Sequence, residues 1–469
     1  MAAEVPELSR VAVVSDLHLP PAERLGNFSA GGDLAAWTAG LARSGASNAA
    51  LVLAGDILDL LLVEDRPATL NLATAARTIG ETLRRLEREQ AWAAAWRDAL
   101  RSWGERGGRT ILVPGNHDPE WFHPDTTAEL ARWITGGAAA APGLMVWREP
   151  EPWKCRAGPW HVLIAHGHRG DAVNDIDPDD VHRALHDGSA RLPLPPGSQL
   201  VLGPLQRFKR AMHSDGRRRF PFLDAVKPEV PAVLLLLLYL DPGLLIRTLP
   251  AALQPLAGMV MRHVRRALCG GSVLGAELAA DSGETGTPGG TAVETLARAL
   301  AADLVGALSE ADRQAPDATL VRLEAHLQGA SAVPEPGTLA ADGGLRRALL
   351  RAWLRRESQT SRRFFDPHRP GPADGQVIAH YLPEGCRRRV VIVGHTHAAR
   401  EIQLDSQRVY LNTGTWTDLL DLSAYDDQDA SLTNLIDMLA GGTLPSFRRQ
   451  TWAEVTTAGP VLRTYPDPR

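Results

Sequence analysis

The chain has 469 residues, of which 44% are hydrophobic and 22% charged, and its length predicts roughly two or three globular domains. Its net charge of −5 is small for this length and gives no sign of a nucleic-acid partner. The three cysteines, far apart and without a C-x-x-C pair, disfavour a disulfide framework and a Cys-rich zinc site. We expect a cytoplasmic protein, because Met1 to Ser9 leave no room for a secretory signal before the first strand.

Apolar runs typical of buried strands recur along the chain, and five of them end in Asp, Asn or His. The runs and the polar residues that follow them are 10–15 with Asp16 and His18, 49–54 with Asp56 and Asp59, 109–114 with Asn116, His117 and Asp118, 161–165 with His166 and His168, and 389–393 with His395 and His397. Open α/β sheets carry active sites at the carboxyl ends of their strands, so we expect these side chains to meet. Solvated loops or ordinary hydrogen bonds are the alternative, which five such ends together disfavour.

Helices are expected between these strands. Residues 69–103 predict one long helix with Trp92, Trp96 and Trp103 on a single face, which we interpret as buried core. A shorter helix is predicted at 125–136. Short strands are predicted at 145–147, 153–155 and 408–412, and a hairpin from 451–457 and 460–465.

Residues 171–388 differ from the flanking parts, because Pro and Gly punctuate them and no metal-ligand spacing occurs there. We predict a mainly helical insertion or cap over the site, with helices near 291–309, 316–328 and 345–363. The rest of the chain then forms one core in two parts, 1–170 and 389–469.

An intensely apolar run, Val233–Leu240, lies within this insertion and continues to Ile246 after Asp241-Pro242. It is shorter than the roughly 20 residues that a spanning helix needs, so we predict a buried or interfacial helix. Basic clusters surround it, at 207–210, 217–219 and 262–266. They are solvated faces or, alternatively, a surface for an anionic substrate or lipid, since Arg suits phosphate.

The ordered motifs D-x-H, G-D-x-x-D, G-N-H-D, H-G-H and G-H-T-H resemble those of the calcineurin-like metallophosphoesterase superfamily, over residues 8–170 and 388–420. The resemblance implies an α/β fold, a two-sheet αββα sandwich, here with a large, mainly helical insertion. It also implies two divalent metal ions, Mn²⁺, Fe or Zn²⁺, because carboxylate and imidazole ligands suit all three.

The resemblance also assigns roles to residues. One cation would be bound by Asp16, His18 and His397, the other by Asn116, His166 and His395, with Asp56 bridging the pair. His117 would protonate the leaving group, oriented by Asp59. Asp118 would fix its loop, and His168 would either line the pocket or make a hydrogen bond behind the ligands.

The implied activity is hydrolysis of a phosphomonoester, phosphodiester or pyrophosphate bond by attack of a metal-bound hydroxide, on a lipid-linked or nucleotide substrate. A nuclease of the same superfamily and a non-catalytic metal-binding scaffold are the alternatives. Nucleic acid is disfavoured because only 5% of residues are aromatic. The bacterial UDP-2,3-diacylglucosamine pyrophosphohydrolases carry a similarly placed but shorter insertion, and have His-Gly-Asp where this chain has His166-Gly167-His168. The apolar run and its flanking arginines would let the insertion contact lipid peripherally at the inner face of the membrane.

Overall fold

The computed structural model describes most of the chain outside the middle of the insertion. The described residues are 5–21, 26–63, 66–171, 173–187, 189–206, 225, 256–269, 297–298, 301–302, 305–306, 308, 310–329, 345–425, 434, 438 and 446–466. The apolar run 233–246, the basic clusters 207–210 and 217–219, and much of the helix expected at 291–309 lie outside these residues. The predictions made for those segments remain predictions.

Two six-stranded sheets form the larger part of the described structure. In the first sheet, four parallel strands continue on one side into an antiparallel hairpin. Its order is β16 (Gly459–Thr464), β15 (Thr451–Thr456), β2 (Arg10–Val14), β3 (Ala49–Ala54), β5 (Arg109–Val113) and β6 (Leu144–Val146). The hairpin predicted near the C-terminus is therefore confirmed, and it joins the sheet beside β2.

The second sheet pairs the fourth and fifth motif-bearing strands, since β8 and β10 are parallel neighbours. Its order is β1 (Glu7–Leu8), β7 (Trp153–Ala157), β8 (Trp160–Ile164), β10 (Arg389–Val393), β12 (Arg408–Thr413) and β11 (Ala399–Gln403). Strands more than 200 residues apart in sequence thus lie side by side, as the register of Val390 with Val162 shows.

The apolar runs form strands because they have two faces to bury. Along β2, Val11 and Val13 pack into a cluster between the two sheets, while Ala12 and Val14 pack towards the helices. All six residues of β3 are buried for the same reason. A parallel strand covered on both faces reads as a continuous apolar run, which is why the sequence showed no polar alternation here.

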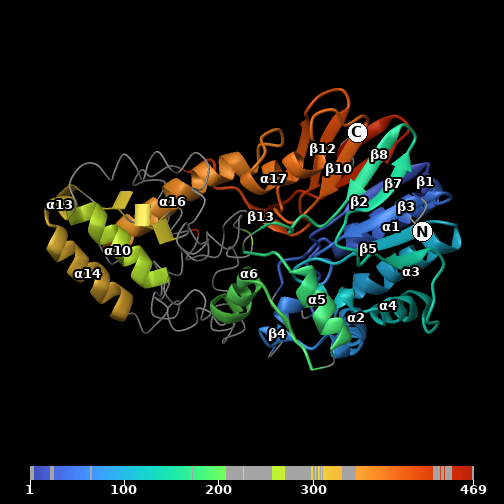
Figure 1. Cartoon of the computed structure of the whole chain (residues 1–469), viewed down its shortest axis with the longest axis horizontal. Helices are drawn as coiled ribbons and strands as arrows, with labels where there is room; N and C mark the ends of the chain where they lie inside the picture. Colours follow the sequence, from blue (N-terminus) through green and yellow to red (C-terminus); the bar gives the residue numbers. More distant parts are fainter. Residues whose placement is uncertain are drawn as a thin grey trace. The chain divides into compact units, whose positions relative to one another are not determined.

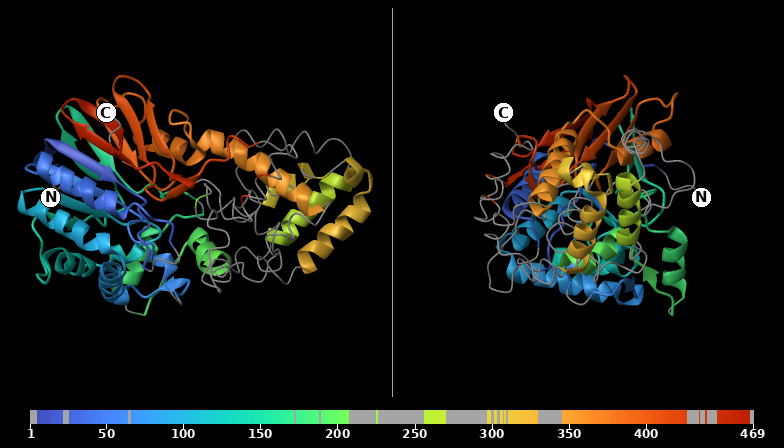
Figure 2. Two further views of the ribbon diagram at one scale, coloured as in Figure 1. Left: turned by 180° about the vertical axis from the view of Figure 1, so that it is seen from behind. Right: turned by 90° about the vertical axis from the view of Figure 1, so that its left-hand side faces the viewer.

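Helices cover both outer faces and complete an αββα sandwich (Figure 1). The first sheet is covered by α1 (Gly31–Gly45), α2 (Ala75–Glu89), α3 (Ala91–Glu105) and α4 (Thr126–Thr135). The second is covered by α17 (Pro372–Tyr381), whose Val377 packs with Val391 and Tyr410. Figure 2 shows the same layers from behind. The predicted fold class is confirmed.

The long helix expected at 69–103 is wrong in two respects. Residues 69–74 form the short strand β4 (Thr69–Leu70) and the short helix η2 (Leu72–Thr74), and the rest breaks at Gln90 into α2 and α3. The backbone of Gln90 is extended, with φ −123° and ψ 107°. The tryptophan face is confirmed as core: Trp96 and Trp103 are buried, and Trp92 packs partly buried against the same cluster.

Short elements connect the layers. They are η1 (Leu60–Leu62), β4 (Thr69–Leu70), η2 (Leu72–Thr74), η3 (Pro119–Phe122), α5 (Pro178–His186), β9 (Leu192–Pro193), α6 (Pro196–Leu200), η4 (Val201–Leu205), β13 (Asp418–Leu420) and β14 (Ser446–Arg448). Of these, β4 pairs with β9 and β13 with β14 in two small sheets.

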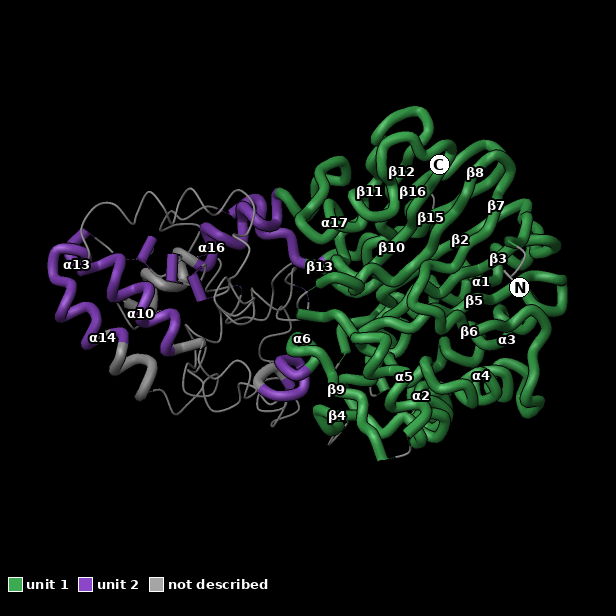
Figure 3. Tube along the Cα trace, in the orientation of Figure 1, with its two compact units in different colours: residues 1–198, 363–419, 447–469 green, residues 199–362, 420–446 purple. Residues whose placement is uncertain are grey.

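The chain divides into two compact units (Figure 3). The first comprises residues 1–198, 363–419 and 447–469 and contains both large sheets. The helices described in or leading from the second unit, 199–362 with 420–446, are α10 (Leu256–Cys269), α13 (Glu310–Gln314), α14 (Pro316–Gly329) and α16 (Leu345–Phe364). Among the helices that the structure describes, none has the length and apolar character needed to cross a membrane.

Candidate metal centre

The candidate ligands lie just beyond the carboxyl ends of β2, β3, β5, β8 and β10. The first three strands are parallel neighbours in one sheet, and the last two are parallel neighbours in the other. Because the sheets pack face to face, these strand ends deliver Asp, Asn and His side chains to one edge of the sandwich. This topology is the reason that the five motifs meet at one edge.

The backbone at these strand ends is strained. Among the described residues, seven that are not glycine have positive φ angles, and five of them are candidate ligands. These five are Asp16 (φ 50°), His18 (47°), Asp56 (52°), His395 (69°) and His397 (59°). A side chain in the left-handed region has an energetic cost, and such residues concentrate at functional sites, where the surrounding structure holds them.

Two motif glycines are required by close approach rather than by their own φ angles. A Cβ atom on Gly115 would lie 2.1 Å from Oδ1 of Asp56. A Cβ atom on Gly394 would lie 2.1 Å from Oδ2 of Asp16. The G-N-H-D and G-H-T-H turns therefore begin with glycine so that their backbones can pass directly over the ligand carboxylates.

One group of potential ligand atoms comes from Asp16, His18 and His397, with all ligand atoms within 4.8 Å of one another. The Nε2 atoms of the two histidines face each other at 2.9 Å, and Nε2 of His397 lies 3.3 Å from Oδ1 of Asp16. The carboxylate of Asp16 is fully buried and also accepts the main-chain N–H of His395 at 2.9 Å. Three donor atoms thus converge on one point.

A second group comprises Asp16, Asp56 and His166. Nε2 of His166 lies 3.2 Å from Oδ2 of Asp56 and 3.1 Å from Oδ1 of Asn116. Nδ1 of His166 donates to the carbonyl oxygen of Ala54 at 2.9 Å, which fixes the proton on Nδ1 and leaves the Nε2 lone pair for a cation. Oδ2 of Asp56 is also 3.8 Å from Nε2 of His18, so this carboxylate lies between the two groups.

His117 is held by Asp59, whose Oδ1 accepts from Nδ1 of His117 at 3.1 Å. The ring stands edge-on to His18 with centroids 4.6 Å apart, so it borders the first ligand group. The main-chain N–H of His117 donates to Oδ1 of Asp56 at 2.8 Å. The Asp59 carboxylate thus fixes the orientation of the His117 ring.

His395 lies beside His166, with ring centroids 5.4 Å apart, but its Nε2 atom faces Asp171 at 2.8 Å. Asp171 was not among the residues predicted from the sequence. It follows His168 by three positions, yet its partner is 224 residues away, so no local pattern indicated the contact.

Asp118 has a larger role than the sequence suggested. Its fully buried carboxylate accepts five N–H groups and ties the G-N-H-D turn to the loop that carries Asp56. The donors are the main-chain N–H groups of Gly115, Asp56, Ile57 and Leu58 and the indole N–H of Trp121. Burial and the charge of Asp56 raise the pKa of Asp118 to about 6, against the N–H donors, which favour the ionised form.

Opposite charges dominate the electrostatics of the centre. Burial opposes ionisation of Asp16 and Asp56, but hydrogen bonding and charge from His397 and His166 lower the pKa of both carboxyls. Burial likewise disfavours the charged form of His166, yet the Asp56 carboxylate raises its pKa to about 10. Anionic carboxylates packed against imidazoles form an environment that favours a cation.

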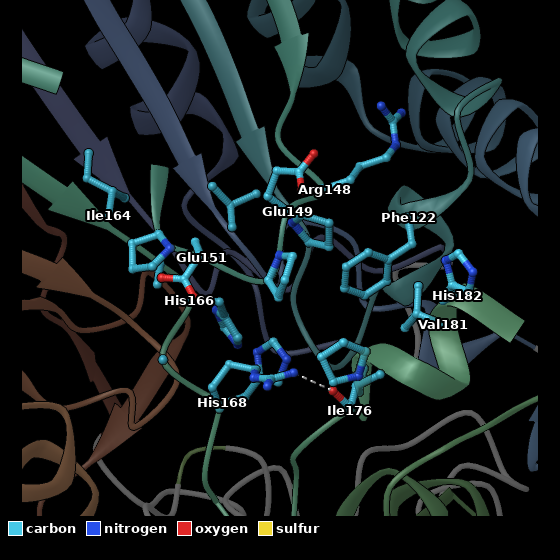
Figure 4. A pocket seen from close by; sticks show the side chains of 18 of the residues that line it. Phe122, Arg148, Glu149, Glu151, Ile164, His166, His168, Ile176, Val181 and His182 are labelled. Carbon is cyan, nitrogen blue, oxygen red and sulfur yellow. Dashed lines mark hydrogen bonds between the residues drawn. The ribbon is translucent and has the colours of Figure 1, made fainter. Parts of the chain in front are cut away.

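A cavity of about 320 Å³ is lined in part by His166 and His168, and so adjoins the centre (Figure 4). Apolar side chains form much of its wall, among them Phe122, Ile176 and Val181. His168 is buried, and its Nδ1 atom has no hydrogen-bond partner among the described residues. Burial and the neighbouring histidines hold its pKa well below the usual value, so of the two roles considered for His168, it lines the pocket as a neutral ring.

The donor set suits a hard or borderline divalent cation. It offers carboxylate oxygens, imidazole nitrogens and one amide oxygen, and no described cysteine lies in it. Mn²⁺, Fe and Zn²⁺ all accept such mixed oxygen and nitrogen ligands.

Residues 9–207 match the family model described as calcineurin-like phosphoesterase. The matched stretch contains four of the five motifs, and G-H-T-H lies beyond it at residues 394–397. No curated protein matches the chain.

Proposed function

We propose that the centre uses two divalent cations to cleave a phosphomonoester, phosphodiester or pyrophosphate bond, because the chain belongs to the calcineurin-like phosphoesterase superfamily and is a metal-dependent phosphoric ester hydrolase. The observation that carries this proposal is the gathering of buried carboxylates and imidazoles from all five strand ends. Held there, two cations would neutralise the phosphoryl oxygens and acidify the attacking water.

The ligands divide into two sets in this proposal. Asp16, His18 and His397 would hold one cation, and their convergence within 4.8 Å supports this assignment. Asn116, His166 and His395 would hold the other. Asp56 would help to hold both, which its position between His18 and His166 supports.

His117 acts as the general acid. Asp59 accepts the Nδ1–H of His117, which orients the ring and stabilises its protonated form, so that Nε2 can deliver a proton to the leaving oxygen. Burial opposes ionisation of Asp59, but the charge and hydrogen bond of His117 hold its pKa well below the ordinary value. Asp59 is therefore an anion throughout the neutral range and does not itself supply the proton.

The cavity beside His166 is our candidate for the pocket that receives the substituent on the phosphate. Its mixed lining of Phe122, Ile176 and Val181 with His168 suits a group that is partly apolar. A lipid-linked substrate bound along Val233–Leu240 is the finer alternative. Those residues lie outside the described part of the chain, so this alternative rests on sequence alone.

A substrate panel with the purified protein and Mn²⁺ tests the proposal. It should contain aryl phosphomonoesters, aryl phosphodiesters, nucleoside diphosphate sugars and single-stranded DNA, with and without anionic liposomes. We expect metal-dependent release of phosphate or of a phosphoryl group from at least one small ester. Cleavage of DNA alone would favour the nuclease, and no hydrolysis of any ester by metal-loaded protein would favour a binding scaffold.

A further inference from the structure

His395 contacts a carboxylate that belongs to none of the five motifs. Oδ2 of Asp171 lies 2.8 Å from Nε2 of His395, the shortest distance from that ring to any carboxylate that the described residues provide. The His395 side chain is only 8% exposed, and Asp171 is 25% exposed, so the pair is largely withdrawn from water. A charge-assisted hydrogen bond in such a place is short and directional.

Asp171 is itself held in place by its own loop. Oδ2 also accepts the side-chain N–H of Asn174, and Oδ1 accepts the main-chain N–H of Val173, each at 2.9 Å. The carbonyl oxygen of Asp171 accepts the N–H of Asp175 at 2.8 Å, and its N–H donates to the carbonyl of His168 at 3.1 Å. The carboxylate thus meets His395 at a fixed position.

The contact determines which nitrogen of His395 can bind a cation. An ionised carboxylate only accepts hydrogen bonds, so Nε2 carries the proton and the lone pair of the neutral ring is on Nδ1. Nδ1 is the ring nitrogen nearer to the main chain, and the main-chain N–H of His395 donates to Oδ2 of Asp16 at 2.9 Å. The main chain of His395 and its Nε2 atom are therefore both held by hydrogen bonds to carboxylates.

We propose that Asp171 is a positioning residue of the metal centre, which holds His395 through Nε2–H so that Nδ1 is the donor atom for the second cation. The assignment rests on the proposed function. It adds Asp171 as a side chain that supports the seven assigned ligands without being one of them. Outer carboxylates of this kind orient a ligand imidazole and increase its basicity, and their loss typically costs about 10–100-fold in metal affinity.

Titration of the chelator-treated protein with Mn²⁺, followed by calorimetry and by metal content after dialysis, tests the proposal. Asp171→Ala removes the acceptor, whereas Asp171→Asn keeps one acceptor oxygen without its charge. Asp175→Ala is the matched control, because Asp175 holds the same loop by accepting the N–H of Gly170 but faces Arg169 rather than His395. Thermal unfolding in chelator establishes that each variant is folded.

We expect wild type to bind two cations and Asp171→Ala to lose about 10–100-fold in affinity for one of them, with a smaller loss in Asp171→Asn. The Asp175→Ala variant should match wild type in both affinities. Two unchanged affinities in Asp171→Ala, or an equal loss in Asp175→Ala, would overturn the proposal. If Asp171→Ala does not fold, Asp171→Asn decides by the same criteria. A wild-type protein that binds no cation would instead refute the proposed function.

Discussion

Replacing Asp118 with Asn tests how the centre is held together. The substitution preserves shape but turns one carboxylate oxygen into an NH₂ group, which cannot accept a hydrogen bond. Oδ1 accepts two N–H groups and Oδ2 accepts three. The best orientation for Asn therefore still leaves two buried donors without an acceptor.

The size of the effect follows from those two donors. A hydrogen bond to a charged group contributes about 1.5–3 kcal/mol to stability, so two lost bonds predict about 3–6 kcal/mol. Burying the charged Asp118 carboxylate is costly, and this cost helps to raise its pKa to about 6. The neutral amide of Asn does not have this cost. We therefore expect a loss near the lower end, about 3 kcal/mol.

Urea unfolding of chelator-treated wild type and Asp118→Asn measures this difference without a contribution from bound cations. Asp125→Asn is the matched control, because its side chain is 76% exposed and makes no capping hydrogen bond at the start of α4. The control should stay within about 0.5 kcal/mol of wild type. A change below about 1 kcal/mol in Asp118→Asn would refute the view that this carboxylate ties the two loops together.

The remaining predictions concern proton transfer and pH. The His117→Ala variant should keep both cations and lose roughly 10²–10⁴-fold in turnover, less for esters with good leaving groups, and Asp59→Asn should show a smaller loss of the same kind. Lost metal, or an equal loss for all leaving groups, would make His117 a ligand instead. In the metal-free protein, Asp56 raises the pKa of His166 above its ordinary value of 6.5 to about 10. That stabilisation is fully present below about pH 6.5 and lost as pH rises through about 10, so thermal unfolding in chelator should show falling stability across this range. Bound cations need neutral His166, so metal affinity should rise over the same range; stability that is flat with pH in chelator would contradict this.

The sandwich could be predicted because its strands bury both faces and end in polar residues. The runs at β2, β3, β5, β8 and β10 needed no long-range information, since local apolar character and the Gly, Asp, Asn or His residues that follow mark each end. What the sequence did not indicate was the break between α2 and α3. The stretch has neither Gly nor Pro near Gln90, and every residue around it favours a helix.

The break has a geometric cause. One helix from Ala75 to Glu105 would be about 45 Å long, whereas a six-residue strand such as β3 spans about 20 Å. The chain must fold back to keep both tryptophan-bearing and leucine-bearing faces on the sheet. Trp92 then packs directly against Gly31 of α1, a contact that no local pattern shows.

The helix α17 was also not predicted from the sequence. Its signals were present: Pro372 begins the helix, and the Asp374 carboxylate accepts the N–H of Gly371 at 2.8 Å. Asp374 is buried beside Tyr410 and Arg400, an arrangement that depends on strands β11 and β12. The position of such a helix therefore depends on contacts with segments that are distant in sequence.

The residues of the site divide in the same way, into those that the sequence indicates and those that only the fold brings together. Those carried by motifs could be proposed because each motif pairs a strand end with a ligand-type side chain. Asp171 could not, because its only distinguishing feature is a contact with His395 across the fold. Asp118 was visible in G-N-H-D, but three of its five donors come from the loop that carries Asp56, so its structural importance is seen only in the folded chain.

Metal content and turnover of Asp56→Asn, measured against wild type, test the two-cation centre most directly. Asp56 is fully buried, lies 3.2 Å from His166 and 3.8 Å from His18, and is the residue proposed to touch both cations. Wild type should carry two cations per chain and hydrolyse an aryl phosphoester, whereas Asp56→Asn should lose cations and nearly all turnover. Full metal occupancy with wild-type turnover in Asp56→Asn would contradict the account.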